Sequence, residues 1–106
     1  MRLVIFETTA EKQKGLIGLR LIPQDTLFIF PNIQSGIRFH ARGVLEPFEI
    51  YFLDKDDNLF QTAQIIPPLG EIRTPIGTIT VIEAKVGTLK KFGIMNIEKA
   101  SSYAKK

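Results

Sequence analysis

Hydrophobic positions along the chain recur in short runs with the spacing expected for β-strands. Residues Thr26 to Phe30 form an almost continuous apolar run that predicts a buried strand, whereas Ile37 to Arg42 alternates apolar and polar side chains. Further apolar or β-branched runs predict strands over residues 2–6, 48–53, 59–66 and 78–85, and residues 94–97 are expected to close the sheet.

Two short segments carry helix-capping signals. Thr8 followed by Glu11 fits a capping box that starts a helix, and Gly15 and Gly18 predict that this helix is interrupted within two turns. Thr88 is the expected N-cap of a second helix of one or two turns, which Gly93 ends. Many strands against two short helices predict a single, mainly β domain, an antiparallel β-sandwich or partly open barrel with two short helices.

Charge is distributed unevenly over the 106 residues, which carry a net charge of +3. Basic and acidic side chains balance over residues 1–98, so the excess comes from Lys99, Lys105 and Lys106, in an expected basic tail over 98–106. A neutral body is a poor match for a nucleic-acid surface, and no apolar run approaches the ~20 residues of a membrane span. We therefore expect a cytoplasmic protein that contacts no membrane and whose main partner is not nucleic acid.

Metal and cofactor chemistry finds little support in the sequence. There is no cysteine and only one histidine, which argues against thiolate centres and His-rich metal sites. Asp54, Asp56 and Asn58 have the spacing of the first ligands of a calcium-binding loop, but Leu59 and Ile65 stand where that loop needs Gly and Glu. We interpret this segment as a polar hairpin turn and expect no metal and no other cofactor.

A polar stripe is the main candidate for function. Alternation places Arg38, His40 and Arg42 on one face of their strand, and Glu49 and Tyr51 share a face of the next strand. If these strands form a hairpin, His40 lies opposite Glu49, and Arg38 lies opposite Tyr51. The two guanidinium groups and the imidazole would suit an anion, and the carboxylate would fix the imidazole tautomer, although cross-strand ion pairs on a solvated sheet face explain the same pattern.

The stripe favours a small non-enzymatic binding module for an anionic ligand or an acidic segment of a partner protein. The alternative is a small enzyme, such as a hydrolase, in which Glu49 orients His40 as general base. Single-stranded nucleic-acid binding is a second alternative and would require Phe39 or Tyr51 to be exposed beside the arginines.

One acidic residue, Glu83, lies late in an apolar strand on the same face as Ile79 and Val81. This position predicts a partly buried carboxylate. We expect it to pair with Arg20 or Arg73.

The order of short motifs over about residues 8–98 resembles the uncharacterised family called domain of unknown function 192. The motifs that carry the resemblance are Thr9-Ala10-Glu11, Gly15-Leu16-Ile17, Arg20, Ile22-Pro23, Thr26 to Phe30, Phe39 to Val44, Pro47 to Phe52, Ile82-Glu83, Gly87-Thr88 and Gly93-Ile94. The resemblance implies a mainly β fold and no established activity. The chain departs from the family where Trp-Met-Lys-Asn-Thr is expected, because it has His40-Ala41-Arg42-Gly43-Val44 there, and where Glu49 replaces the family's Asp.

Overall fold

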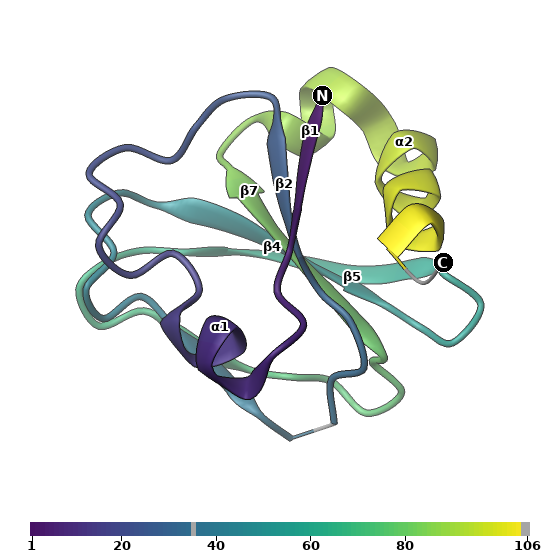
Figure 1. Ribbon diagram of the computed structural model, residues 1–106, viewed down its shortest axis with the longest axis horizontal. Coiled ribbons are helices and arrows are strands. Elements are labelled where there is room, and N and C mark those ends of the chain that lie inside the picture. The colour runs from purple at the N-terminus through teal and green to yellow at the C-terminus, as the bar shows by residue number, and fades with distance from the viewer. Residues whose placement is uncertain (35, 105–106) are drawn as a thin grey trace.

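A mixed five-stranded sheet forms the centre of the protein, in a computed structural model that describes residues 1–34 and 36–104 (Figure 1). Its strands, in spatial order, are β1 (Arg2–Ile5), β2 (Thr26–Phe30), β7 (Thr80–Lys85), β4 (Phe48–Leu53) and β5 (Leu59–Ile65). The first pair, β1 and β2, is parallel, and the other neighbours are antiparallel. A second sheet contains β3 (Arg38–His40) and β6 (Glu71–Arg73), and the helices are α1 (Thr9–Lys14) and α2 (Thr88–Ala104).

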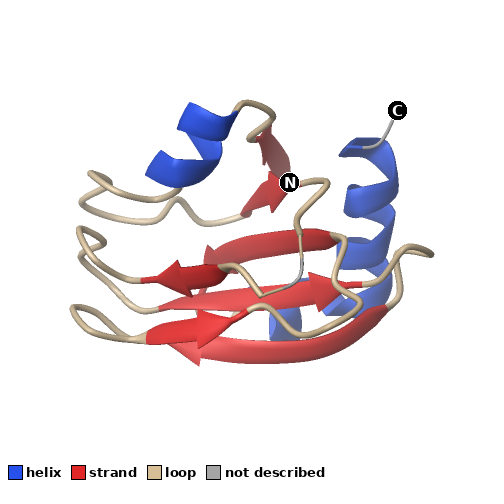
Figure 2. Ribbon diagram, turned by 90° about the horizontal axis from the view of Figure 1, so that it is seen from below, coloured by secondary structure: helices blue, strands red, loops and turns tan. Residues whose placement is uncertain are grey.

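The mainly β class predicted from the sequence is confirmed, and the arrangement differs from the antiparallel one expected in one respect. The central sheet is mixed, because a long connection containing α1 joins β1 to its parallel neighbour β2. The described strands form no closed barrel, in agreement with the expected sandwich or partly open barrel. Figure 2 shows the shorter helix over the strands and the longer helix at their side.

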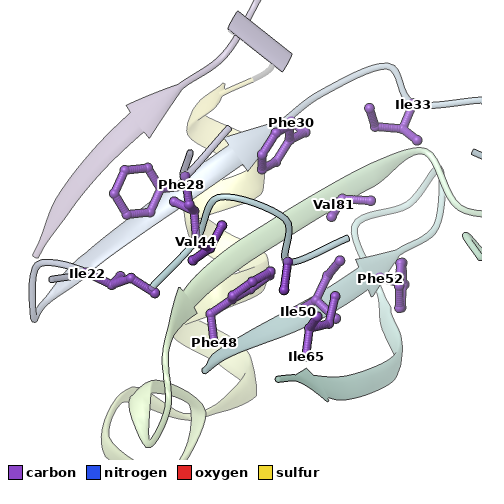
Figure 3. Close-up of a cluster of buried hydrophobic side chains, with 12 residues drawn as sticks. Ile22, Phe28, Phe30, Ile33, Val44, Phe48, Ile50, Phe52, Ile65 and Val81 are labelled. Atoms are coloured by element: carbon purple, nitrogen blue, oxygen red, sulfur yellow. The ribbon is translucent and has the colours of Figure 1, made fainter. Parts of the chain in front are cut away.

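Two hydrophobic clusters occupy the opposite faces of the central sheet. Helix α2 packs Ile97 and Ala100 against alternate residues of β2, β4 and β7. The other face holds side chains from the same strands, together with residues from the loops after α1 and β3 (Figure 3). Because neighbouring residues in a strand point to opposite faces, Phe48, Ile50 and Phe52 lie in this second cluster while Tyr51 faces α2.

Local sequence signals predicted most strand positions. The bounds of β2 and β4 agree with the prediction, and the capping box of α1 is present, with Glu11 N–H donating to Thr8 Oγ1 at 3.1 Å. The hairpin turn after β4 is also confirmed, because Asp54 Oδ1 accepts hydrogen bonds from the backbone N–H groups of Asp56 and Asn58. These signals succeed because each depends on contacts between residues close in the chain.

The C-terminal segment was predicted incorrectly. Residues 94–97 are not a strand, since they belong to α2, which continues through Lys99 to Ala104 in place of the expected tail. Gly93 breaks the helix with φ at +80°, as the sequence suggested, but a second helical segment follows at once. Lys105 and Lys106 lie outside the described residues.

Candidate functional site

A cavity of about 510 Å³ opens on the sheet face opposite α2. The C-terminal end of α1 and the residues after it form one wall, β3 forms another, and the central strands form the floor. Its apolar lining includes three phenylalanine rings, those of Phe30, Phe39 and Phe48. Phe30 and Phe39 meet edge to face with ring centroids 5.3 Å apart, so β2 and β3 are joined through aromatic contact.

Glu83 is the only acidic residue among the described residues that line this cavity. It lies in the middle strand, β7, with Phe28 of β2 and Ile50 of β4 as its cross-strand neighbours. Only 4% of the residue is exposed, and the described part of the chain offers its carboxyl group no hydrogen bond or ion pair. Burial raises the pKa of Glu83 to about 8.

The expected pairing of Glu83 with Arg20 or Arg73 is wrong. Both arginines are exposed, and Arg73 lies in β6 opposite Arg38. The basic residue two positions along the strand, Lys85, instead contacts Glu46, with Nζ 3.5 Å from Oε1. The carboxyl group therefore faces an apolar cavity without a basic partner among the residues described.

Basic side chains line the cavity from two walls, and the exposed ones among them mark its mouth. Lys12 and Lys14 come from α1, whereas Arg38 and His40 come from β3 on the facing wall. Lys14, Arg38 and His40 are exposed, and the Arg38 side chain contacts Glu71 across a 3.6 Å ion pair. The site therefore combines a basic mouth, aromatic walls and one buried carboxyl group.

The hairpin predicted between residues 37–42 and 48–53 does not form. Strand β3 pairs with β6, so His40 lies opposite Glu71 rather than Glu49, and Arg38 lies opposite Arg73 rather than Tyr51. The expectation of a carboxylate across from His40 was right in kind and wrong in partner. Arg42 follows the strand in a turn, and its backbone N–H donates to His40 Nδ1 at 3.2 Å.

Glu49 and Tyr51 lie on the other side of the central sheet, where they hold α2 in place. One carboxylate oxygen of Glu49 accepts from Tyr51 Oη at 2.5 Å and from Leu89 N at 3.2 Å, and the other accepts from Gly87 N at 3.0 Å. Glu49 therefore caps the helix, whereas the expected cap Thr88 donates its hydroxyl to the Lys85 carbonyl.

The same contacts set the ionisation of this pair. Burial alone would raise the pKa of Glu49, but the hydrogen bonds from Tyr51 and the helix N–H groups outweigh it and hold that pKa below its ordinary value. Burial, followed by the adjacent Glu49 carboxylate, raises the pKa of Tyr51. Tyr51 is completely buried and Phe39 partly so, which leaves Tyr51 with no exposed ring on which a base could stack.

Replacing Glu49 is expected to destabilise the fold rather than to affect the cavity. Glu49→Ala removes three accepted hydrogen bonds and leaves the buried Tyr51 hydroxyl unsatisfied, so we expect a loss of about 2–4 kcal/mol in unfolding free energy. Urea denaturation measures this loss, and Tyr51→Phe in the Glu49→Ala background should recover part of it. A loss below about 0.5 kcal/mol, the usual size for a neutral surface change, would contradict the capping role.

The cavity itself was not apparent from the sequence. Its lining comes from segments far apart in the chain, and the pairing of β3 with β6 has no local signal because β6 has only three residues. The one sign of the cavity in the sequence was an acidic residue, Glu83, in an otherwise apolar run.

In the described chain, no helix has the length and apolar character to cross a membrane, and no three His, Cys, Asp or Glu side chains form a metal-binding group.

A family model described as an uncharacterised ACR, domain of unknown function 192, matches residues 1–99. The chain belongs to this family. Its fold is similar to that of a protein of unknown function from Novosphingobium aromaticivorans, with 21% identity, a TM-score of 0.74, and coverage of 86% of this chain and 67% of that one. It is also similar to a candidate transcription regulator from Sinorhizobium meliloti, with 16% identity, a TM-score of 0.67, and coverage of 84% and 71%. No match was found among curated proteins.

At these identities, the two structures support the fold alone. The family resemblance adds information about position, because several of its motifs meet at the cavity. Gly15 to Ile17, Phe30, Phe39 and Glu83 all belong to matched motifs and all line it. The segment in which this chain departs from the family, His40 to Val44, contributes to one wall.

Proposed function

We propose that this protein binds a small amphipathic molecule in the cavity, with the apolar body of the ligand against the phenylalanine rings and an anionic group at the mouth. The observation that carries the proposal is the cavity itself, whose volume of about 510 Å³ lies within the usual range for small-molecule sites. Aromatic walls bury apolar surface, and a few polar groups at defined positions provide orientation.

The charges at the mouth support an anionic group on the ligand. Lys12 and Lys14 of α1 and Arg38 of β3 all line the cavity, and no acidic side chain other than Glu83 lines its described part. A guanidinium group suits bidentate contact with a carboxylate or a phosphate. The anion site that we predicted from the sequence therefore keeps Arg38 and His40, gains the two lysines, and no longer includes Arg42, Glu49 or Tyr51.

Blocking the cavity provides the first test. We expect hexanoate to shift the amide NMR signals of residues 12–17 and 37–40 at a pH of about 6, where Glu83 is uncharged. Ile37→Trp should weaken binding about tenfold, because the side chain lines the cavity and is only 43% exposed. Ile76→Trp is the matched control, since Ile76 is 93% exposed and does not line it. Shifts confined to other surfaces, or equal effects of the two variants, would contradict the proposal.

The arginines offer a second matched pair for the same titration. Arg38→Gln should weaken hexanoate binding several-fold, whereas Arg42→Gln should leave it unchanged, because only Arg38 lines the cavity. Salt should weaken binding to the wild-type protein, since exposed charges are screened over roughly 8–10 Å at physiological ionic strength.

A catalytic role is a second candidate, and one observation favours it. Glu83 has a pKa near 8 in an apolar cavity, which is the usual setting of a general acid, and His40 lines the same cavity. Hydrolysis of p-nitrophenyl butyrate above the buffer rate would support this role if Glu83→Gln abolished it. An unchanged rate in that variant would exclude Glu83 as the acid for this probe.

A further inference from the structure

We propose that Glu83 binds a cationic nitrogen, so that the ligand of the cavity carries an ammonium group at its inner end and an anionic group at its outer end. The inference rests on the proposed function and names the ligand class. Its first basis is that the Glu83 carboxyl group lines the cavity and has no partner within the described chain. Buried carboxyl groups are normally paired or hydrogen-bonded, to protein groups, to ordered water or to a ligand, so a carboxyl group that faces a cavity is placed to contact a charged or donor group of the ligand.

The surroundings of Glu83 favour a cation as that partner. Phe30, Phe39 and Phe48 line the same space, and the electron-rich faces of aromatic rings attract ammonium groups. A carboxylate combined with aromatic rings therefore stabilises a positive charge in two ways, by ion pairing and by cation–π contact.

The charged groups around the site explain why the cation must be accompanied by an anion. Lys12 and Lys14 on α1 and Arg38 on β3, the last of them ion-paired with Glu71, line the same cavity and disfavour a ligand that carries positive charge alone. Strands β2 and β4, which flank Glu83, present Phe28 and Ile50 at its level and add no charge there. A ligand with separated opposite charges matches the carboxyl group inside and the basic groups outside.

Ionisation of Glu83 gives this binding a characteristic pH dependence. The empty site holds a neutral carboxyl group below a pH of about 8, so a cation must displace its proton to form the ion pair. Affinity for the cationic end should therefore rise about tenfold for each pH unit from about 6 to about 8 and then level off. The alkyl ammonium group of the probe stays charged throughout, since amines of the lysine type titrate near 10.4.

Four probes of similar length separate the two ends of the ligand: 6-aminohexanoate, hexanoate, hexylamine and hexanol. Amide NMR titration at a pH of about 8 should show 6-aminohexanoate binding at least about tenfold more tightly than each of the others. Aminobutanoate and aminooctanoate test whether a different spacing between the charges fits better. Glu83→Gln, which keeps the size of the side chain, should remove the advantage over hexanoate and abolish its pH dependence.

Controls make the outcomes distinct. Asp56→Asn removes an exposed carboxylate in the turn after β4 and should change nothing. If hexanoate or hexanol shifts the cavity amides as strongly as the amino acids at every pH, the cavity binds ligands but Glu83 does not select a cation, and this inference is wrong. If none of the probes shifts these amides, the proposed function fails as well. The pH profile of the wild-type protein decides the matter even if Glu83→Gln does not fold.

Discussion

The wild-type protein is expected to lose stability as the pH rises from about 5 to about 8, and Glu83→Gln is expected to remove that loss. Glu83 titrates near 8 in the folded protein because it is buried, whereas in the unfolded chain it titrates at its ordinary value of 4.5. Between these values the unfolded chain releases a proton that the folded protein keeps, so increasing pH favours unfolding. The slope is about 1.4 kcal/mol per pH unit, and the total is on the order of 4 kcal/mol.

Urea denaturation at a series of pH values measures this dependence. The window is well separated from that of Glu49, whose lowered pKa provides stability that is lost only as the solution becomes more acidic than its ordinary value of 4.5. Asp56→Asn is the matched control, because its exposed carboxylate should leave the slope unchanged. A wild-type unfolding free energy that stays constant from pH 5 to 8 would show that Glu83 is not buried as described.

Truncating Phe28 is expected to destabilise the protein far more than truncating His40 does at constant pH. Phe28 is 5% exposed, belongs to the cluster on the cavity side of the sheet, and stacks on Phe6 with ring centroids 5.8 Å apart. Phe28→Ala should therefore cost about 3–5 kcal/mol through lost burial and an unfilled space. His40→Ala should change the unfolding free energy by less than about 0.5 kcal/mol, because His40 is exposed.

Thermal or urea denaturation of the two variants makes the comparison directly. Similar losses in both would mean that the faces of β2 and β3 are assigned wrongly. A normal unfolding free energy for His40→Ala also makes it a suitable background for ligand titration at the mouth of the cavity.

Elements that depend on neighbouring residues could be predicted from the sequence, and pairings between distant strands could not. The residues that determine the Thr8–Glu11 capping box, and those that determine the strand β2, lie within a few positions of one another in the sequence. Strand β3 pairs with β6 because the chain between β5 and β6 brings residues 71–73 alongside it. The alternation of residues 37–42 is equally compatible with pairing to β4 or to β6.

The candidate site was predicted in part for the same reason. Alternation correctly placed Glu49 and Tyr51 on one face of β4, yet it could not show that α2 covers that face. The length of α2 was missed because Gly93 is a stop signal that a following helical segment overrides by packing Ile97 and Ala100 on the sheet. The sequence marked Glu83 as unusual, but the lack of a partner for its carboxyl group in the described chain depends on all the segments around the cavity.

The strands that form the floor of the cavity are anchored by many buried contacts, whereas the segments that form its walls are anchored by few. Its floor belongs to the buried central strands, whereas α1 has no buried residue, and β3 pairs with no strand other than β6 in the described chain. Segments with so few anchoring contacts open locally at a small cost in free energy, and their amide hydrogens exchange with solvent correspondingly fast. A ligand that spans from Glu83 to Lys14 and Arg38 would hold both walls against the floor. Binding of such a ligand should therefore slow amide hydrogen exchange in α1 and β3 and change it little in β7.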